Sequence, residues 1–149
     1  MDETMIATRT LILIDASSPH GEGGLSVLTH DDQAITLLLT LDGRSAASLR
    51  DFAGAEDIDV SMAGLIYLDQ VVCRLSLHTD DIETISTAGS DAVGEILHVL
   101  QHRRVSRVIV PASLPGLEDG GLVRLLQVCP VAVLVAPRVE TRAEFPIAS

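Results

Sequence analysis

Residues Val105–Ala136, VSRVIVPASLPGLEDGGLVRLLQVCPVAVLVA, indicate the fold most clearly, because two uninterrupted apolar runs flank a segment with helical spacing. The first run is Val108–Val110 and the second is Val131–Ala136. A strand that is apolar at successive positions is covered on both faces, so these runs predict two parallel strands with helices on both sides of the sheet. Pro130 ends the crossover helix that joins them. The inward stripe of that helix is expected at Leu122, Leu125, Leu126 and Cys129.

Three further β-prone segments precede this unit, at Thr8–Ile14, Ala34–Leu41 and Ile82–Thr87. Helices are expected within Gly24–His30, from Met62 to Leu77 behind an N-cap at Ser61, and over Val93–Leu100 behind a cap at Ser90 or Asp91. Between Ser45 and Ser61 the pattern is interrupted by Gly54 and several acids, so only a helical turn and an exposed loop are predicted there. Strands that alternate with helices in this way predict an α/β fold, a doubly wound, five-stranded parallel sheet of the Rossmann-like type.

Composition limits both the size and the partners of this fold. The chain has 149 residues, of which 47% are hydrophobic, and this predicts one domain, 1–149, with a loose tail at 139–149. The 21 acidic residues outnumber the 10 basic ones, all arginine, and give a net charge of -11. Such a charge repels phosphate backbones and anionic lipids, so neither nucleic acid nor a membrane surface is an expected partner.

The cysteines and the N-terminal residues indicate the compartment. Cys73 and Cys129 lie in apolar helical stretches, where they are interpreted as small core residues and not as a disulfide or a metal pair. Asp2 and Glu3 precede a short apolar run, which is not the pattern of a signal peptide or a spanning helix. We therefore expect a cytoplasmic protein.

Three segments in this order resemble one known family. They are the strand that ends ILIDASS at residues 12–18, the segment TAGSDAVGEILHVLQHRRVSRVIVPAS at 87–113, and the closing CPVAVLVAP at 129–137. In order and spacing they are similar to the universal stress protein family, an α/β fold with five parallel strands that functions in the stress response. The resemblance implies a homodimer in which the last strands of two subunits meet, here through Val131, Val133 and Val135.

The resemblance also indicates where a nucleotide would bind. In nucleotide-binding members, an Asp after the first strand contacts the nucleoside, and Asp15, with Ser17 beside it, matches that position. The loop after the fourth strand is glycine-rich in those members and holds the phosphates, whereas here Ala112 and Ser113 stand at its start. These four residues form a candidate vestigial nucleotide site. Asp15 can also be interpreted as a turn-capping residue.

The loop departs from the family pattern in ways that oppose ATP. Pro111 and Pro115 lack the backbone N–H groups that would bind phosphate, and Glu118 and Asp119 would repel it. A carboxylate such as Asp15 still suits a ribose hydroxyl. We therefore expect no bound cofactor, with ATP disfavoured and a nucleoside or cyclic nucleotide less so.

The remaining motifs do not complete a catalytic or metal site. Gly21, Gly23 and Gly24 do not form a GxGxxG, and a Walker lysine is impossible in a chain without Lys. His98 and His102 are one helical turn apart, but neither Glu nor Cys completes a HExxH-like zinc set, so a solvated helix face is expected. With no nucleophile, base and orienting group in sight, we predict no catalytic residues and no metal.

Three function classes remain open. The first is a non-enzymatic, dimeric, universal-stress-type binding or regulatory module that has lost ATP. The second is a nucleotide or small-ligand sensor that uses Asp15 and the loop at Ser113 at the carboxyl ends of the strands. The third is an enzyme of the wider nucleotide-binding α/β group, which the missing catalytic set disfavours. A fold alone does not choose between these classes.

Overall fold

The computed structural model describes residues 9–16, 28, 33–41, 43–75, 81–87, 91–112, 117 and 120–136, the side chains of 43–45 and 74–75 excepted. Several sequence predictions lie outside these residues. They are the short helix within 24–30, the tail at 139–149, the two serines of the vestigial site (Ser17 and Ser113), and the acids Glu118 and Asp119. None of the described helices combines the length and the apolar character that crossing a membrane requires.

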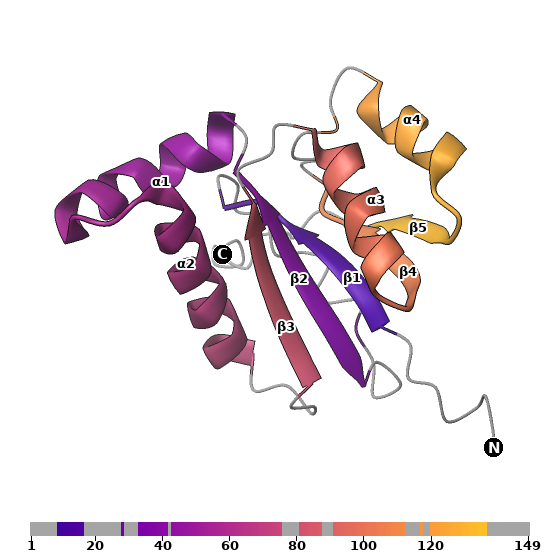
Figure 1. Ribbon diagram of the computed structural model, residues 1–149, viewed down its shortest axis with the longest axis horizontal. Helices are drawn as coiled ribbons and strands as arrows, with labels where there is room; N and C mark the ends of the chain where they lie inside the picture. Colours follow the sequence, from indigo (N-terminus) through magenta and orange to yellow (C-terminus); the bar gives the residue numbers. More distant parts are fainter. Residues whose placement is uncertain are drawn as a thin grey trace, which may run out of the picture.

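The described strands form one parallel sheet in the order β3-β2-β1-β4-β5 (Figure 1). Their bounds are β1 Arg9–Ile14, β2 Ala34–Thr40, β3 Asp81–Thr87, β4 Val105–Val110 and β5 Ala132–Val135. Four of the five strands were predicted to within one residue at each end, whereas β4 begins three residues before the apolar run Val108–Val110 that predicted it. This agreement arises because parallel strands buried on both faces leave continuous apolar runs in the sequence.

The helices cover both faces of the sheet, which confirms the doubly wound arrangement. Their bounds are α1 Gly43–Glu56, α2 Val60–Leu75, α3 Ala92–His102 and α4 Gly121–Val128. Figure 1 shows α1 and α2 grouped on one side of the sheet, and α3 and α4 on the other. We call these sides the α2 face and the α3 face.

Alternate residues of the central strands point to opposite faces and build two cores. On the α3 face, Leu11 and Leu13 of β1 pack with Ile96 of α3 and Leu125 of α4. On the α2 face the core consists of Ile12, Ile14, Ile35, Leu37 and Leu39 with Leu49, Ala63 and Leu68. Every residue of β2 is buried, so β2 lies in the centre of the molecule.

Helix α1 corrects one prediction. The segment expected to be a helical turn and a loop is a helix of 14 residues. Gly54 lies inside it, because one glycine costs a helix only about 1 kcal/mol relative to alanine and the buried side chains of Leu49 and Ala53 anchor the helix on the sheet. The chain leaves the helix at Asp57, whose φ of 56° is left-handed.

The helix caps correct two more predictions. Helix α2 begins two residues before the expected start, and its cap is Asp59 and not Ser61, since Asp59 Oδ1 accepts a hydrogen bond from the Met62 N–H at 2.8 Å. Asp91 is the N-cap residue of α3, but its side chain makes no capping bond. It accepts instead two hydrogen bonds from Arg124 Nη2, at 2.8 and 3.0 Å. The side chain of Asp91 therefore ties α3 to α4.

The closing unit is less buried than its sequence indicates. Leu125 of α4 is fully buried, but Leu126, which was expected beside it, is 55% exposed. In β5, Leu134 and Val135 are 40% and 47% exposed, so a single chain does not cover this strand on both faces. The interpretation of Cys73 as a core residue is wrong, because Cys73 is exposed on α2.

Candidate functional site

The order of the strands defines where a ligand would bind. From β1 the chain proceeds to β2 and β3 on one side, whereas β4 and β5 lie on the other side. The carboxyl ends of β1 and β4 therefore flank the switch point at which open α/β sheets bind ligands. Asp15 directly follows β1, and Pro111 and Ala112 directly follow β4.

The register brings the described members of the predicted site together. Ile12 pairs with Ile109, so continuing the register by three positions puts Asp15 opposite Ala112. On the other side Ile14 pairs with Leu39, so one further step puts Asp15 beside Thr40, which in turn pairs with Thr87. We call this line of residues the carboxyl-edge row. It consists of Thr87, Thr40, Asp15 and Ala112.

All four residues of the carboxyl-edge row belong to the α3 face. Each lies two positions after a residue that packs in or against the core of that face, and residues two apart in a strand point to the same side. Those preceding residues are Ile85, Leu38, Leu13 and Val110. The row thus continues an apolar face with hydroxyl and carboxyl groups at the carboxyl ends of β1, β2 and β3.

Asp15 is more deeply placed than its position at a strand end indicates. Its side chain is 0% exposed, although it directly follows the last residue of β1. Burial of a carboxylate is costly unless polar groups surround it, and Asp15 does interact with other groups of the chain. Nearby, Ser48 Oγ of α1 donates a hydrogen bond to the Ala16 carbonyl at 3.3 Å, which holds the turn after β1.

The hydroxyl groups of the row are buried. Thr40 is 1% exposed, and neither its Oγ1 nor that of Thr87 has a hydrogen-bond partner among the described residues. Thr36, at the opposite end of β2, differs. It accepts a hydrogen bond from Arg9 Nε at 2.9 Å and donates one to Glu83 Oε1 at 3.2 Å. A buried hydroxyl left unpaired costs about 1–3 kcal/mol, so two neighbouring cases mark a place where a ligand's polar groups would be accommodated.

The groups available to bind phosphate are few. In the first turn of α4, the Leu122 N–H donates to the Leu117 carbonyl at 3.1 Å. The left-handed residue before this helix is Gly120, with φ 90°, and its carbonyl accepts from the Arg124 N–H at 3.0 Å. The guanidinium of Arg124 is directed at Asp91 and not toward the row.

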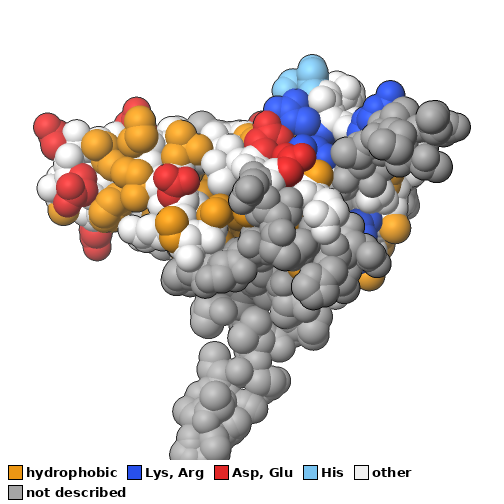
Figure 2. All heavy atoms as spheres, turned by 90° about the horizontal axis from the view of Figure 1, so that it is seen from below, with side chains coloured by type: hydrophobic (Ala, Val, Ile, Leu, Met, Phe, Trp, Pro, Cys, Tyr) orange, Lys and Arg blue, Asp and Glu red, His pale blue; other side chains and the backbone are white. Residues whose placement is uncertain are grey.

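A second polar cluster lies at the amino ends of the strands and joins β1, β3 and the end of α3. Arg9 Nη2 bonds Asp81 Oδ1 at 2.9 Å, and Arg103 Nε bonds Glu83 Oε1 at 2.8 Å. Figure 2, which views the molecule from this side, shows Arg and acidic side chains gathered together. The hydrogen bond from Arg103 lowers the pKa of Glu83, and the charges of Arg103 and Arg9 add to this effect. The hydrogen bonds of this cluster are internal, so we assign it a structural role.

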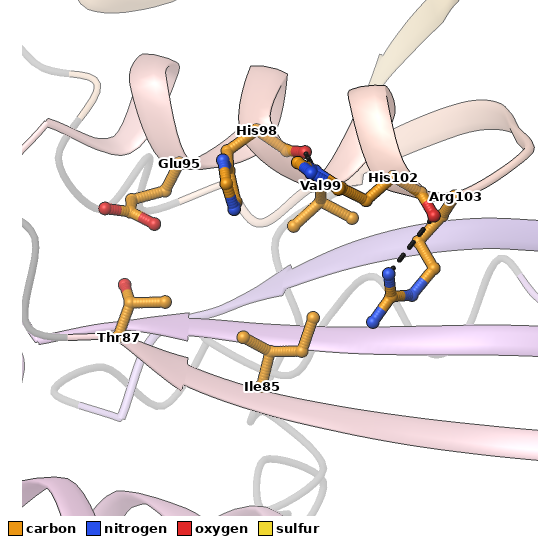
Figure 3. A pocket seen from close by; sticks show the side chains of 7 residues that line it. All are labelled: Ile85, Thr87, Glu95, His98, Val99, His102 and Arg103. Atoms are coloured by element: carbon orange, nitrogen blue, oxygen red, sulfur yellow. Dashed lines mark hydrogen bonds between the residues drawn. The ribbon is translucent and has the colours of Figure 1, made fainter.

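A cavity that sequence reasoning missed lies between α3 and β3 and has a volume of about 430 Å³. Its lining residues are Ile85 and Thr87 of β3, Glu95, His98, Val99 and His102 of α3, and Arg103 (Figure 3). We call it the α3–β3 cavity. The sequence shows only that the spacing of Glu95, His98 and His102 puts all three on one side of a helix, and this spacing does not by itself indicate a cavity.

The two histidines of α3 do not form a metal centre with other groups of the described chain. His102 Nδ1 lies 2.9 Å from the His98 carbonyl, and both rings are exposed. Among the described residues, no group of three or more His, Cys, Asp or Glu is arranged to hold a metal ion.

Two solved structures that share this fold are those of hypothetical proteins. PH0823 is 16% identical to this chain, with a TM-score of 0.59 over 89% of this chain and 97% of its own. MJ0577, the subject of a structure-based assignment of biochemical function, is 14% identical, with a TM-score of 0.61 over 91% of this chain and 100% of its own. No protein-family model matches the sequence, and none of the curated proteins compared with it does. At these identities the likeness is one of fold, and it confirms the five-stranded Rossmann-like α/β architecture.

Proposed function

We propose that this protein is a non-enzymatic, universal-stress-type binding and regulatory module. Its carboxyl-edge row takes a small, weakly charged ligand, such as a nucleoside or cyclic nucleotide, and binds ATP poorly. The observation that carries the proposal is the buried Asp15 beside Thr40, whose hydroxyl has no partner among the described residues, at the switch point of the sheet.

The chemistry of the row suits a ligand that presents hydroxyl groups. An ionised carboxylate only accepts hydrogen bonds, whereas a threonine hydroxyl both donates and accepts one. A ribose edge supplies donors for Asp15 and either role for Thr40.

The same region is poorly equipped for a polyphosphate. Pro111 has no N–H, the Leu122 N–H is bonded to Leu117, and Arg124 is held by Asp91. The chain as a whole has a net charge of -11. Each missing charge-assisted hydrogen bond is worth about 1.5–3 kcal/mol, so the loss of two weakens ATP binding by roughly a hundredfold or more.

The dimeric part of the proposal rests on β5. This strand is the edge of the sheet beyond β4, and its apolar residues Leu134 and Val135 are 40% and 47% exposed in the single chain. An apolar edge strand is normally paired or covered. A second copy of the chain, related by a twofold axis, would cover it with an identical surface.

Native co-purification followed by mass spectrometry tests the binding function. The protein is purified without nucleotide, denatured, and its released small molecules are identified. Wild type and Thr84→Val are expected to release the same nucleoside-like molecule, and Thr40→Val to release little of it. Thr84 is the matched control because it is also a strand threonine, but it lies one residue out of step with Ile85 and so faces away from the row. Stoichiometric release of ATP, or equal release from all three proteins, would contradict the proposal.

A further inference from the structure

The outer strand on the β3 side of the sheet is incompletely covered by helix α3. Every residue of β2 is buried, whereas Ile82–Thr87 are only half-buried. Val99 of α3 packs into the core of the α3 face, so the helix lies over the inner strands and only its outer side reaches β3. The α3–β3 cavity of about 430 Å³ occupies the uncovered space. This volume lies in the usual range for small-molecule sites, roughly 300–1,000 Å³.

Apolar side chains form the base of this cavity, and hydrogen-bond acceptors lie at its rim. Ile85 and Val99 supply apolar surface, and Thr87 contributes a buried hydroxyl without a partner among the described residues. Figure 3 shows the Thr87 hydroxyl directed toward α3, on the side where Glu95 extends its carboxylate. An ionised carboxylate is an acceptor only, so this end of the cavity calls for a ligand with N–H or O–H donors.

The other end carries no spare positive charge. Arg103 donates from Nε and Nη2 to Glu83 and from Nη1 to the His102 carbonyl. The lowered pKa of Glu83 keeps that carboxylate ionised, so this pair is neutral as a whole. His102 Nδ1 lies 2.9 Å from the His98 carbonyl, which can only accept, so this nitrogen is the donor of that hydrogen bond. Among the lining charges, Glu95 is therefore the one that no described group balances.

We infer that the α3–β3 cavity binds a small organic amine. Its ammonium group meets the carboxylate of Glu95 and the hydroxyl of Thr87, and its apolar body packs on Ile85 and Val99. The net charge of -11 on the chain also attracts a cation over an anion. The cavity adjoins the carboxyl-edge row and shares Thr87 with it, but Asp15 and Thr40, which carry the nucleoside proposal, do not line it.

Three probes with the same apolar body and different head groups test the inference by NMR titration of the full-length protein. They are 2-phenylethylamine, 2-phenylethanol and 3-phenylpropionate. The amine is expected to shift the signals of Ile85, Val99 and His98, and to bind at least tenfold more tightly than the other two. Equal affinity of the three probes, tighter binding of the carboxylate, or no shift of these signals at millimolar amine would overturn the inference.

Two variants locate the amine. Glu95→Gln is expected to weaken the binding of 2-phenylethylamine about tenfold to a hundredfold, which corresponds to one charge-assisted hydrogen bond. The affinity for 2-phenylethanol should not change. Glu56→Gln removes an exposed carboxylate from α1, far along the chain, and is expected to change neither. Thr40→Val, which acts on the carboxyl-edge row, should leave the amine bound, so failure of the nucleoside proposal does not affect this result. Equal weakening by Glu95→Gln and Glu56→Gln would show general charge attraction and would overturn the site.

Discussion

At the scale of single residues, the hydroxyl of Thr40 is expected to lower stability although the proposed ligand needs it. Its hydroxyl is buried and has no partner among the described residues, so Thr40→Val replaces it with a methyl group of similar shape. We expect the free energy of unfolding to rise by about 1 kcal/mol, because the cost of the unpaired hydroxyl disappears. Urea denaturation measures this change, with Thr84→Val as the control. A loss of stability at Thr40 would mean that the hydroxyl is bonded in the folded protein.

At the scale of elements, substitution of two glycines in neighbouring helices by alanine should change the stability in opposite directions. A Cβ at Gly64 of α2 would lie 2.4 Å from Ser86 Oγ and 3.2 Å from Leu39 Cδ2, whereas a Cβ at Gly54 of α1 would meet nothing within 4 Å. Gly54→Ala should therefore stabilise the protein by about 0.5–1 kcal/mol through helix propensity. Gly64→Ala should destabilise it by about 1–3 kcal/mol through overpacking against β3 and β2.

The double variant Gly64→Ala with Ser86→Ala isolates the cause of that loss. Removing Ser86 Oγ relieves the shorter of the two contacts, so part of the stability should return. Thermal melts of the single and double variants give the comparison. If Gly64→Ala stabilises as much as Gly54→Ala, then α2 does not approach β3 as closely as described here.

The link between β3 and the end of α3 depends on pH. Arg103 lowers the pKa of Glu83, so the folded chain binds this proton less readily than the unfolded chain, where the value is near 4.5. The ion pair therefore contributes stability above about pH 4.5, and this contribution is lost as the pH falls through the lowered folded pKa. Denaturation should show that wild type has a higher free energy of unfolding than Glu83→Gln at neutral pH, and that this difference disappears in acid. Glu56→Gln should unfold with the same free energy as wild type at neutral pH. A difference between wild type and Glu83→Gln that grows in acid would contradict the proposed ion pair.

At the scale of the whole molecule, the exposed edge at β5 predicts a homodimer. Light scattering at tens of micromolar should give twice the monomer mass, and Leu134→Glu should give the monomer mass, because a charge in an apolar contact has no partner. Val123→Glu places the same charge on an exposed position of α4, outside the strand, and should remain dimeric. A monomer mass for the wild-type protein at this concentration would contradict the predicted homodimer.

The sequence predicts the sheet well and the positions of side chains less well, for physical reasons. The apolar segments Ala34–Leu41 and Val108–Val110 identify β2 and β4 as strands, because burial on both faces leaves a continuous apolar pattern in the local sequence. The sequence leaves open whether β5 is covered within one chain or by a second copy, since a run of valines indicates burial but does not say which chain provides the cover. The choice of Asp59 over Ser61 as a cap depends on backbone geometry, because both residues have capping side chains.

In the candidate site, too, the place of a residue along the chain was predicted but its surroundings in space were not. The position of Asp15 at the switch point follows from the order of the strands, whereas its complete burial depends on segments that surround it in space. The pairing of Thr40 with Thr87 is a matter of register, which two separate segments of sequence do not fix by themselves. The α3–β3 cavity depends on the lateral position of α3 over the sheet. Tertiary packing sets this position, so no local pattern predicts the cavity.

Calorimetric titration of the wild-type protein with adenosine and with Mg-ATP tests the proposal that the carboxyl-edge row binds a weakly charged ligand through Asp15 and Thr40 and lacks the groups that hold phosphates. We expect adenosine to bind at least tenfold more tightly than Mg-ATP, and Asp15→Ala to abolish the heat of adenosine binding. Low-micromolar binding of Mg-ATP that is lost in Asp15→Ala would contradict the proposal.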